Sequence, residues 1–241
     1  MRNFIAVVLV AVAALFAGQV LAADLPQYAP VISPPPVDTG IGGSYYLRAS
    51  VGLNGLWSNN DTYMDCGCGT STNTVHPVTT AGYGYSFGAG FGYEVGNGLR
   101  ADVTLDQINN SGASDGTYSL DLRSTIALAN AYYDFGFDGR GGSVGGGFGG
   151  YVGAGIGAAY NQTHVTGGVA AGPDGANFTA AGALMTGVTY DMGNAVADLG
   201  YRMIYMPQIS NGDAAVFPAT PFYVNQNVIH EVRASLRYRL N

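Results

Sequence analysis

The sequence predicts an all-β fold: an eight-stranded antiparallel transmembrane β-barrel with long extracellular loops and short periplasmic turns. Three observations support this prediction. Stretches in which apolar residues alternate with small or polar ones recur about eight times, with no helical pattern between them. The connections between these stretches alternate between long and short. The N-terminus resembles an export signal, and no later apolar run is long enough for a membrane helix, so any membrane insertion must use strands.

Residues 83–95 show the alternation most clearly. Tyrosine, phenylalanine, alanine and valine occupy one parity, and glycine, serine and glutamate occupy the other. Successive side chains of a strand point to opposite faces, so one face is aromatic and the other is small or polar. The aromatic residues gather toward the two ends of the stretch, as they do where a strand crosses both membrane interfaces.

The composition favours a lipid-facing surface. Charged residues make up 10% of the 241 positions and lysine is absent, whereas a soluble domain carries roughly 25% charged residues. The formal net charge of −7 makes nucleic acid an unfavourable partner.

The N-terminal region is predicted to be processed rather than folded. Residues 1–22 match a signal peptide, with Arg2 as its positive start, an apolar stretch at 4–16 and the small-x-small cleavage site Val20-Leu21-Ala22. Residues 23–43 hold five prolines and are expected to be an extended segment in the periplasm. The barrel is then expected to occupy residues 44–241.

The first three strands are expected at 45–54, 83–95 and 99–106. A long polar segment at 57–81 separates the first two. The second and third are joined by Gly96-Asn97-Gly98, which predicts a tight hairpin turn because Asn and Gly accept positive φ at little cost. Residues 109–116 are expected to form a short loop.

The fourth strand, at about 118–135, changes its apolar parity along its length. Apolar residues first occupy Tyr118, Leu120, Leu122, Ile126 and Leu128, and then Ala129, Ala131, Tyr133 and Phe135. If all of them face lipid, a one-residue slip must occur near 127–130, most simply a β-bulge.

The last four strands are expected at 148–160, 178–190, 197–203 and 228–240. Their connections are a glycine-rich segment at 136–147, a polar loop at 161–177, a tight turn at 191–194 and a loop with three prolines at 207–225. This alternation of lengths places both termini in the periplasm.

The charged residues of the strands occupy the inward parity. This placement is favourable, because an arginine that faces lipid at mid-depth costs roughly 2–4 kcal/mol. An eight-stranded barrel is only wide enough for side chains to fill it. The interior is therefore either an ion-paired plug or a narrow polar conduit, and inward glycines on the second and fifth strands leave volume for the conduit. The predicted lumen-lining residues are Arg48, Arg100, Asp102, Asp106, Arg123, Asp134, Asp198, Arg202, Glu231, Arg233, Arg237 and Arg239, with Asp121 on the same parity.

Several stretches resemble a known family. They are Ala22-Ala23-Asp24-Leu25-Pro26, Asn130-Ala131-Tyr132-Tyr133-Asp134-Phe135, Asp198-Leu199-Gly200-Tyr201-Arg202, and Glu231 to Arg239 at the end of the chain. They are similar to the small alphaproteobacterial outer-membrane proteins of the surface-antigen or porin family, relatives of OmpA-type eight-stranded barrels. The resemblance implies a Gram-negative outer-membrane location and insertion by the barrel-assembly machinery, which recognises an amphipathic last strand.

Candidate residues for chemistry are few. Cys66 and Cys68 form a Cys-Gly-Cys sequence in the first long loop, and three interpretations stay open: a disulfide in an oxidising compartment, free thiols, or a metal site with Asp65 and His76. His76 and His164 are expected in loops, and His230 on the outward parity of the last strand. We expect no cofactor and no enzymatic activity.

The predicted function is a structural and surface-interaction role in the outer membrane. The alternative is a narrow porin that passes ions or small solutes through the Arg- and Asp-lined lumen. A lipid-modifying enzyme ranks last. The expected partners are outer-membrane lipids and lipopolysaccharide, the barrel-assembly machinery, and host or phage surfaces that contact the loops.

Overall fold

The fold is described here from a computed structural model that covers residues 43–67, 70–137, 147–167, 174–212 and 222–240, without the side chains of 63–67, 70–74 and 222. Within these ranges the regular structure is entirely β, and no helix is long and apolar enough to cross a membrane. The strands are β1 (Ser44–Trp57), β2 (Asn60–Gly67), β3 (Thr70–Pro77), β4 (Gly82–Glu94), β5 (Leu99–Ser114), β6 (Tyr118–Gly136), β7 (Gly147–Gly167), β8 (Gly175–Asp191), β9 (Ala195–Ser210) and β10 (Phe222–Leu240).

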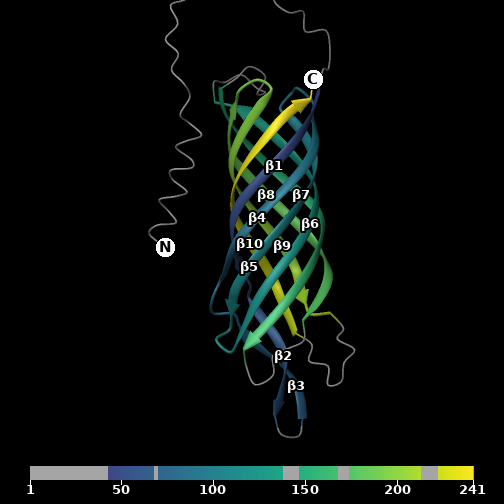
Figure 1. The fold of residues 1–241 in the computed structure, drawn as a ribbon, viewed down its shortest axis with the longest axis vertical. Helices are drawn as coiled ribbons and strands as arrows, with labels where there is room; N and C mark the ends of the chain where they lie inside the picture. Colours follow the sequence, from purple (N-terminus) through teal and green to yellow (C-terminus); the bar gives the residue numbers. More distant parts are fainter. Residues whose placement is uncertain (1–42, 68–69, 138–146, 168–173, 213–221, 241) are drawn as a thin grey trace, which may run out of the picture. The chain divides into compact units, whose positions relative to one another are not determined.

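Eight of these strands form a closed antiparallel ring, as the sequence predicts. The order is β1-β4-β5-β6-β7-β8-β9-β10, and β10 pairs with β1 to close it (Figure 1). One row of paired residues starts at Tyr45 and passes through Tyr93, Ala101, Ala131, Ala154, Leu184, Met203 and His230 before it reaches Gly55. The row therefore comes back to β1 at Gly55, ten residues after Tyr45, where it started (55 − 45 = 10). Such a stagger tilts the strands of a barrel.

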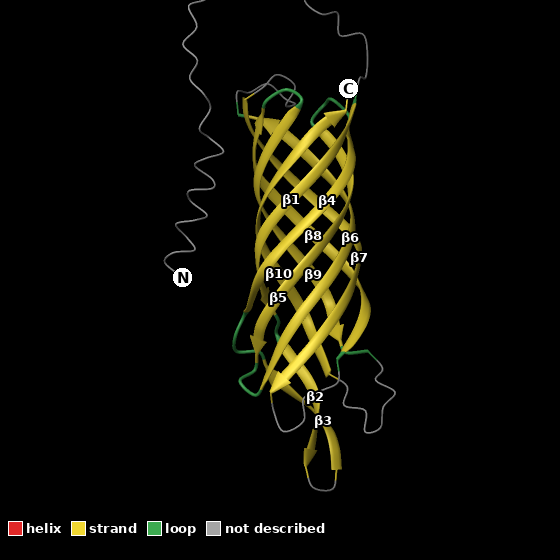
Figure 2. Cartoon of the chain, in the orientation of Figure 1, coloured by secondary structure: helices red, strands yellow, loops and turns green. Residues whose placement is uncertain are grey.

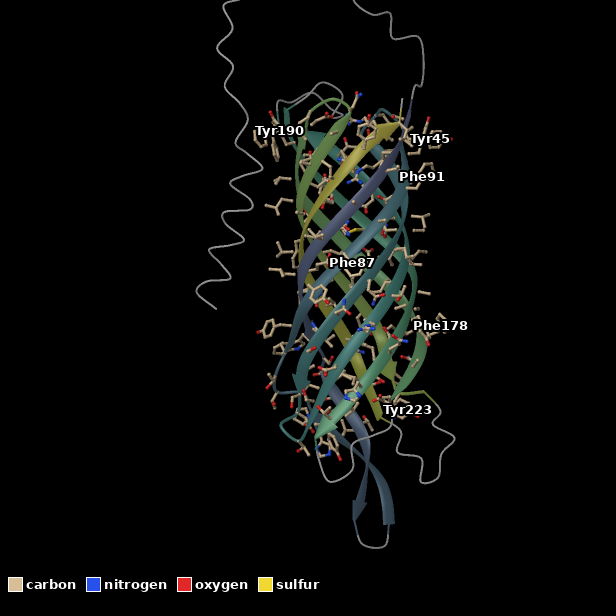
Figure 3. All side chains as sticks on the ribbon, in the orientation of Figure 1. Tyr45, Phe87, Phe91, Phe178, Tyr190 and Tyr223 are labelled. Carbon is tan, nitrogen blue, oxygen red and sulfur yellow. The ribbon has the colours of Figure 1, made fainter. Side chains whose placement is uncertain are left out.

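The outer face carries the apolar belt that a transmembrane barrel presents to lipid. Figure 3 shows Tyr45, Phe91 and Tyr190 pointing outward near one end, and Phe178 nearer the other. The Tyr45 and Phe91 rings stack with centroids 5.6 Å apart, and the Tyr160 and Phe178 centroids are 4.8 Å apart. These are two aromatic girdles with apolar side chains between them. We call the end with the short turns the periplasmic end; it also holds the end of β10.

The tight turns at the periplasmic end are confirmed. Gly96 and Gly98 have φ values of 92° and 89°, a backbone region that glycine enters without strain. Gly193, between β8 and β9, has a φ of 92° and fills the same role.

The predicted slip in the fourth strand is wrong. β6 pairs with β7 without interruption from Tyr118 to Gly136, and the one shift against β5 lies between Ser111 and Ala113 of β5, around Gly112. Leu122 and Leu128 therefore point inward, on the same parity as Asp134, and are buried. The slip was inferred on the assumption that apolar side chains must face lipid, whereas the interior itself is apolar at this level.

Strands β2 and β3 form a hairpin within the stretch that was expected to be a polar segment. β2 pairs with β3 along its length, and residues 60–63 continue the edge of β10 at Phe222–Asn225. Figure 2 shows this hairpin extending beyond the ring, at the end opposite the short turns. Threonine is frequent in strands, which agrees with its abundance in residues 70–74.

Candidate functional site

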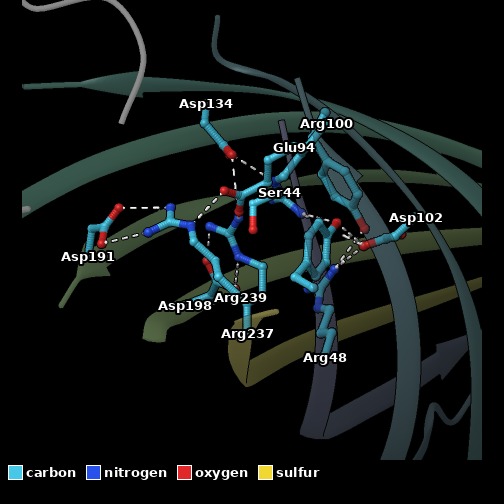
Figure 4. Close-up of polar contacts among 12 residues, drawn as sticks. Ser44, Arg48, Glu94, Arg100, Asp102, Asp134, Asp191, Asp198, Arg237 and Arg239 are labelled. Carbon is cyan, nitrogen blue, oxygen red and sulfur yellow. Dashed lines mark hydrogen bonds and ion pairs between the residues drawn. The ribbon is translucent and has the colours of Figure 1, made fainter. Parts of the chain in front are cut away.

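The half of the interior nearest the periplasmic end is an ion-paired layer, shown in Figure 4. Arg237 donates two bonds to the Asp198 carboxylate, at 3.2 and 3.3 Å, and one to Glu94 at 2.6 Å. Arg239 donates to both oxygens of Asp191, at 3.0 and 2.9 Å, and to Glu94 at 2.7 Å. Bidentate arginine–carboxylate bonds hold both partners in a fixed geometry.

Arg48 on β1, which is paired with Arg237 of the neighbouring β10, and Arg100 on β5 complete this layer. Arg100 donates to Asp134 at 2.7 Å, and its guanidinium lies 3.7 Å from the centre of the Tyr132 ring. Arg48 donates to the Tyr132 hydroxyl at 2.8 Å and to Asp102 at 3.3 Å. The aromatic ring and the carboxylates together compensate the two buried cations.

A second cluster of charges lies further toward the extracellular end. Arg202 donates to Asp106 at 2.7 Å and to Glu231 at 3.0 Å, and all three side chains are almost inaccessible to solvent. Arg233 approaches Asp106 to 4.0 Å. Arg202 thus has two carboxylates as its direct partners.

The extracellular half of the interior is mainly apolar, with neutral polar side chains such as Ser124, Asn161 and Asn227 buried among the apolar ones. The change occurs between two neighbouring inward rows: Asn54, Glu231 and Arg202 are paired across β1, β10 and β9, and the next row holds Leu56, Ile229 and Ile204. The side chains of that next row are 0% exposed. Further buried apolar residues include Ile108, Leu120, Leu122, Ile126, Leu128, Val165, Met206 and Ile209.

The glycines that seemed to leave room for a conduit are covered by large side chains. On β7, the predicted fifth strand, a Cβ added at Gly153 would lie 2.4 Å from the Tyr132 ring; Gly200 on β9 is covered in the same way, 2.1 Å from the Tyr151 hydroxyl. At Gly88 an added Cβ would lie 2.1 Å from Asp106. The missing Cβ atoms therefore provide space for tyrosine and carboxylate groups and not for solvent.

The interior is closed to water in both halves. Arg202 and Arg237 are each 1% exposed, and the apolar rows are equally inaccessible. A channel wide enough for water would expose the side chains that line it. Of the two interpretations of the lumen, the structure favours the plug.

Most predicted lumen residues lie in the interior. Those that are buried there are Arg48, Arg100, Asp102, Asp106, Asp134, Asp198, Arg202, Glu231, Arg233 and Arg237, and Arg239 lies at the periplasmic mouth. Arg123 does not line the lumen: it is exposed on the outward face of β6, and Asp121 shares that face. Because β6 has no slip, one parity applies along its whole length. The residues that sequence analysis did not select are Glu94, Asp191 and the tyrosines 46, 132 and 151, whose inward parity was the available signal.

The cysteine interpretations are outside the described residues, since the Cys66 side chain and all of Cys68 are not covered. The histidines are placed on strands: His76 in β3, His164 in β7 beside Asp174, and His230 on the outer face of β10 with its Nδ1 2.5 Å from the Tyr201 hydroxyl. Among the described residues, no group of three or more His, Cys, Asp or Glu side chains is arranged to hold a metal ion.

Asp61 marks the extracellular mouth, where the hairpin joins the ring. It is 3% exposed and lines a hollow of about 10 Å³ with Ser58, Tyr118 and Leu120. Burial raises the pKa of the Asp61 carboxyl from 3.8 to about 6, and the nearby charge of Asp115 adds to this shift while His76 opposes it. A carboxylate that is ionised here destabilises the folded mouth.

No family model and no curated protein matches the chain. Solved structures do match it. Neisserial surface protein A is 22% identical, with a TM-score of 0.54 over 83% of this chain and 99% of that one. OprG from Pseudomonas aeruginosa is 14% identical (TM-score 0.49; 82% and 97% covered), and Ail of Yersinia pestis is 11% identical (0.41; 82% and 99%). At these identities the match with the neisserial protein speaks for the fold alone: this chain has the fold of a small outer-membrane β-barrel.

Proposed function

We propose that this protein is a non-conducting barrel of the Gram-negative outer membrane, with a structural role and with surface contacts made at its extracellular end. The observation that carries the proposal is the closed interior, in which an ion-paired layer and an apolar layer follow one another along the axis. A barrel without a passage can act through the membrane around it and through the strands and loops that it exposes. The interior side chains are buried from solvent, and they therefore give no support to the alternative of a narrow porin.

The hairpin β2–β3 and the extended ends of β6 and β7 are the described elements that a surface partner would meet. The fold-level likeness to a protein named as a neisserial surface protein agrees with such a role. The family assignment belongs to the proposal as well: we propose membership of the alphaproteobacterial surface-antigen group, with lipopolysaccharide, the barrel-assembly machinery and external host or phage surfaces as partners. We propose no enzymatic activity.

Liposome swelling tests the proposal. The protein is refolded into liposomes, and folding is confirmed by the difference in gel migration between boiled and unboiled samples. With arabinose as the external solute, we expect swelling at the rate of liposomes without protein, because no water-wide path crosses the interior. Swelling that increases with the amount of folded protein would establish a porin.

The surface role has a separate test. Replacement of residues 60–77 by a short Gly-Ser linker removes the hairpin and leaves the eight ring strands. We expect the shortened protein to reach the outer membrane and to lose binding to intact target cells. Unchanged cell binding by this variant would remove the hairpin from the proposal.

A further inference from the structure

The outer face of β4 to β8 changes from apolar to polar over three neighbouring rows. One row is Ala89, Leu105, Ala127, Ala158 and Ala180, and the next toward the extracellular end is Phe87, Gln107, Thr125, Tyr160 and Phe178. The third row is Tyr85, Asn109, Arg123, Gln162 and Ala176. The aromatic row thus belongs to the girdle nearer the extracellular end, and the polar row is the next row in the extracellular direction.

This position fits the level of lipid headgroups. An arginine on the outer face of a barrel costs roughly 2–4 kcal/mol at the bilayer midplane and about 0–1 kcal/mol near an interface. Arg123 is exposed on this face, so its row lies at or above the interface. Asp121 and His164 are paired one row further out.

The polar row borders a groove of about 770 Å³. Its walls include Tyr85, Asn109, Asp121, Arg123, Gln162 and His164. Asn109 belongs to β5, Asp121 and Arg123 belong to β6, and Gln162 and His164 belong to β7. The Tyr85 ring is 57% exposed and forms an apolar wall.

Four of these side chains are available to a ligand. Within the described part of the chain, no hydrogen bond or ion pair engages the side chains of Asn109, Asp121, Arg123 or Gln162. The buried and half-buried arginines of the described barrel are all within 4.0 Å of a carboxylate. Arg123 differs from them in both its exposure and its lack of a partner.

The groove offers both hydrogen-bond donors and hydrogen-bond acceptors. Arg123 supplies five N–H donors, Asn109 and Gln162 each supply an amide donor and a carbonyl acceptor, and Asp121 supplies a carboxylate acceptor. A phosphate group would meet the carboxylates of Asp121 and Asp174 in the same groove and be repelled by them. Sugar hydroxyls both donate and accept, and the apolar face of a sugar ring can lie against a tyrosine.

We propose that this groove binds a saccharide, with Asn109, Arg123 and Gln162 as hydrogen-bonding residues and Tyr85 as the apolar wall. The inference rests on the proposed surface role, because saccharides reach a groove at the headgroup level only from the extracellular side. Two sources of saccharide share this chemistry: the sugars of a glycolipid in the outer leaflet, and a free glycan presented from outside.

Isothermal titration of the full-length protein in detergent micelles tests the inference. The probes are a delipidated, dephosphorylated core oligosaccharide from lipopolysaccharide, the free glycan lacto-N-tetraose, and inorganic phosphate. The variants are Arg123→Ala and Gln162→Ala, with Gln208→Ala as the matched control, since Gln208 is exposed on β9 and outside the groove. Boiled and unboiled gel migration confirms that each variant is folded.

We expect at least one oligosaccharide to bind, and the one that binds identifies the source. Arg123→Ala should weaken its Kd about tenfold or more, and Gln162→Ala roughly fivefold, as the loss of a charged and a neutral hydrogen bond predicts. Gln208→Ala should leave the Kd within about twofold.

Three results would overturn the saccharide assignment: no oligosaccharide binding by folded protein, binding that both groove variants leave unchanged, or phosphate that displaces the oligosaccharide. The liposome result is independent of all three. A barrel that swells liposomes and still binds sugar through Arg123 would lose the proposed function and keep the groove.

Discussion

The two halves of the barrel interior are closed by different physical means. Near the periplasmic end, arginines are matched to carboxylates and tyrosines within 2.6–3.3 Å. Toward the extracellular end, the interior is filled mainly by apolar side chains, among them Leu56, Ile204 and Ile229. A paired charge depends on one partner in one geometry, whereas an apolar side chain depends on volume. The two halves should therefore respond differently to substitution, although both exclude water.

The largest expected effect is the loss of one buried cation. Arg202→Met leaves Asp106 and Glu231 without their shared partner, and we expect the free energy of unfolding to fall by about 3–5 kcal/mol. Urea unfolding in lipid vesicles, followed by gel migration, measures it. Adding Asp106→Asn and Glu231→Gln to Arg202→Met should restore most of the lost free energy of unfolding. If Arg202→Met alone lowers that free energy by less than about 1 kcal/mol, the ion pairs of Arg202 are not needed for stability.

A truncation in the apolar half comes next. Ile204→Ala should cost about 2–5 kcal/mol, because a cavity forms among fully buried neighbours, and Ile204→Val only about 0.5–1.5 kcal/mol. The matched control is Leu199→Ala on the outer face of the same strand, where Leu199 is 57% exposed. Equal losses at Ile204 and Leu199 would contradict an apolar core inside the barrel.

The mouth above the apolar half should respond to pH. The folded pKa of Asp61 lies near 6, above its ordinary value of 3.8, so the folded state binds more protons than the unfolded state between about pH 4 and 6. Stability should therefore fall as the pH rises through this window and stay roughly 1–3 kcal/mol lower above it.

Asp61→Asn should remove this pH-dependent loss, which unfolding curves at pH 4, 5, 6 and 7 would reveal. Asp121→Asn is the control, because Asp121 lies on the outward face of β6 and forms no ion pair within the described residues. If Asp61→Asn loses stability between about pH 4 and 6 as the parent does, the pH dependence comes from other groups.

The smallest effect is expected at Arg123. Arg123→Gln should change stability by less than about 0.5 kcal/mol, since the side chain is exposed and forms no pair within the described residues. Arg100→Gln, by contrast, removes a 2.7 Å bond to Asp134 and should be strongly destabilising. Urea unfolding of the two variants side by side compares an outward with an inward arginine, and similar losses would place Arg123 in the interior.

Much of this organisation was predictable from alternation alone. Parity placed Arg48, Arg100, Asp198 and Arg237 inside, and the turn at 96–98 followed from its residue types. Parity failed on β6, because Leu122 and Leu128 were assigned to lipid before the apolar interior was known. One strand read by itself cannot distinguish an inward leucine from an outward one.

The closure of the interior was not predictable for a related reason. Whether Gly153 or Gly200 opens a passage depends on the residue across the sheet, and Tyr132 and Tyr151 are brought there by register. Sequence spacing within one strand does not supply that register. The hairpin β2–β3 was not predicted because β2 extends the edge of β10, and the two paired segments lie at least 159 residues apart in the sequence (222 − 63 = 159).

Single-channel recording in planar bilayers tests the central claim most directly. The folded protein is compared with a triple variant, Leu56→Ala, Ile204→Ala and Ile229→Ala, which removes one fully buried row of the apolar half. The closed interior predicts a silent membrane for the parent and the same silence for the variant, because the ion-paired layer of Arg48, Arg100 and Arg237 still fills the other half. Reproducible conductance steps from the folded parent would contradict a closed barrel and make the Arg- and Asp-lined interior a pore.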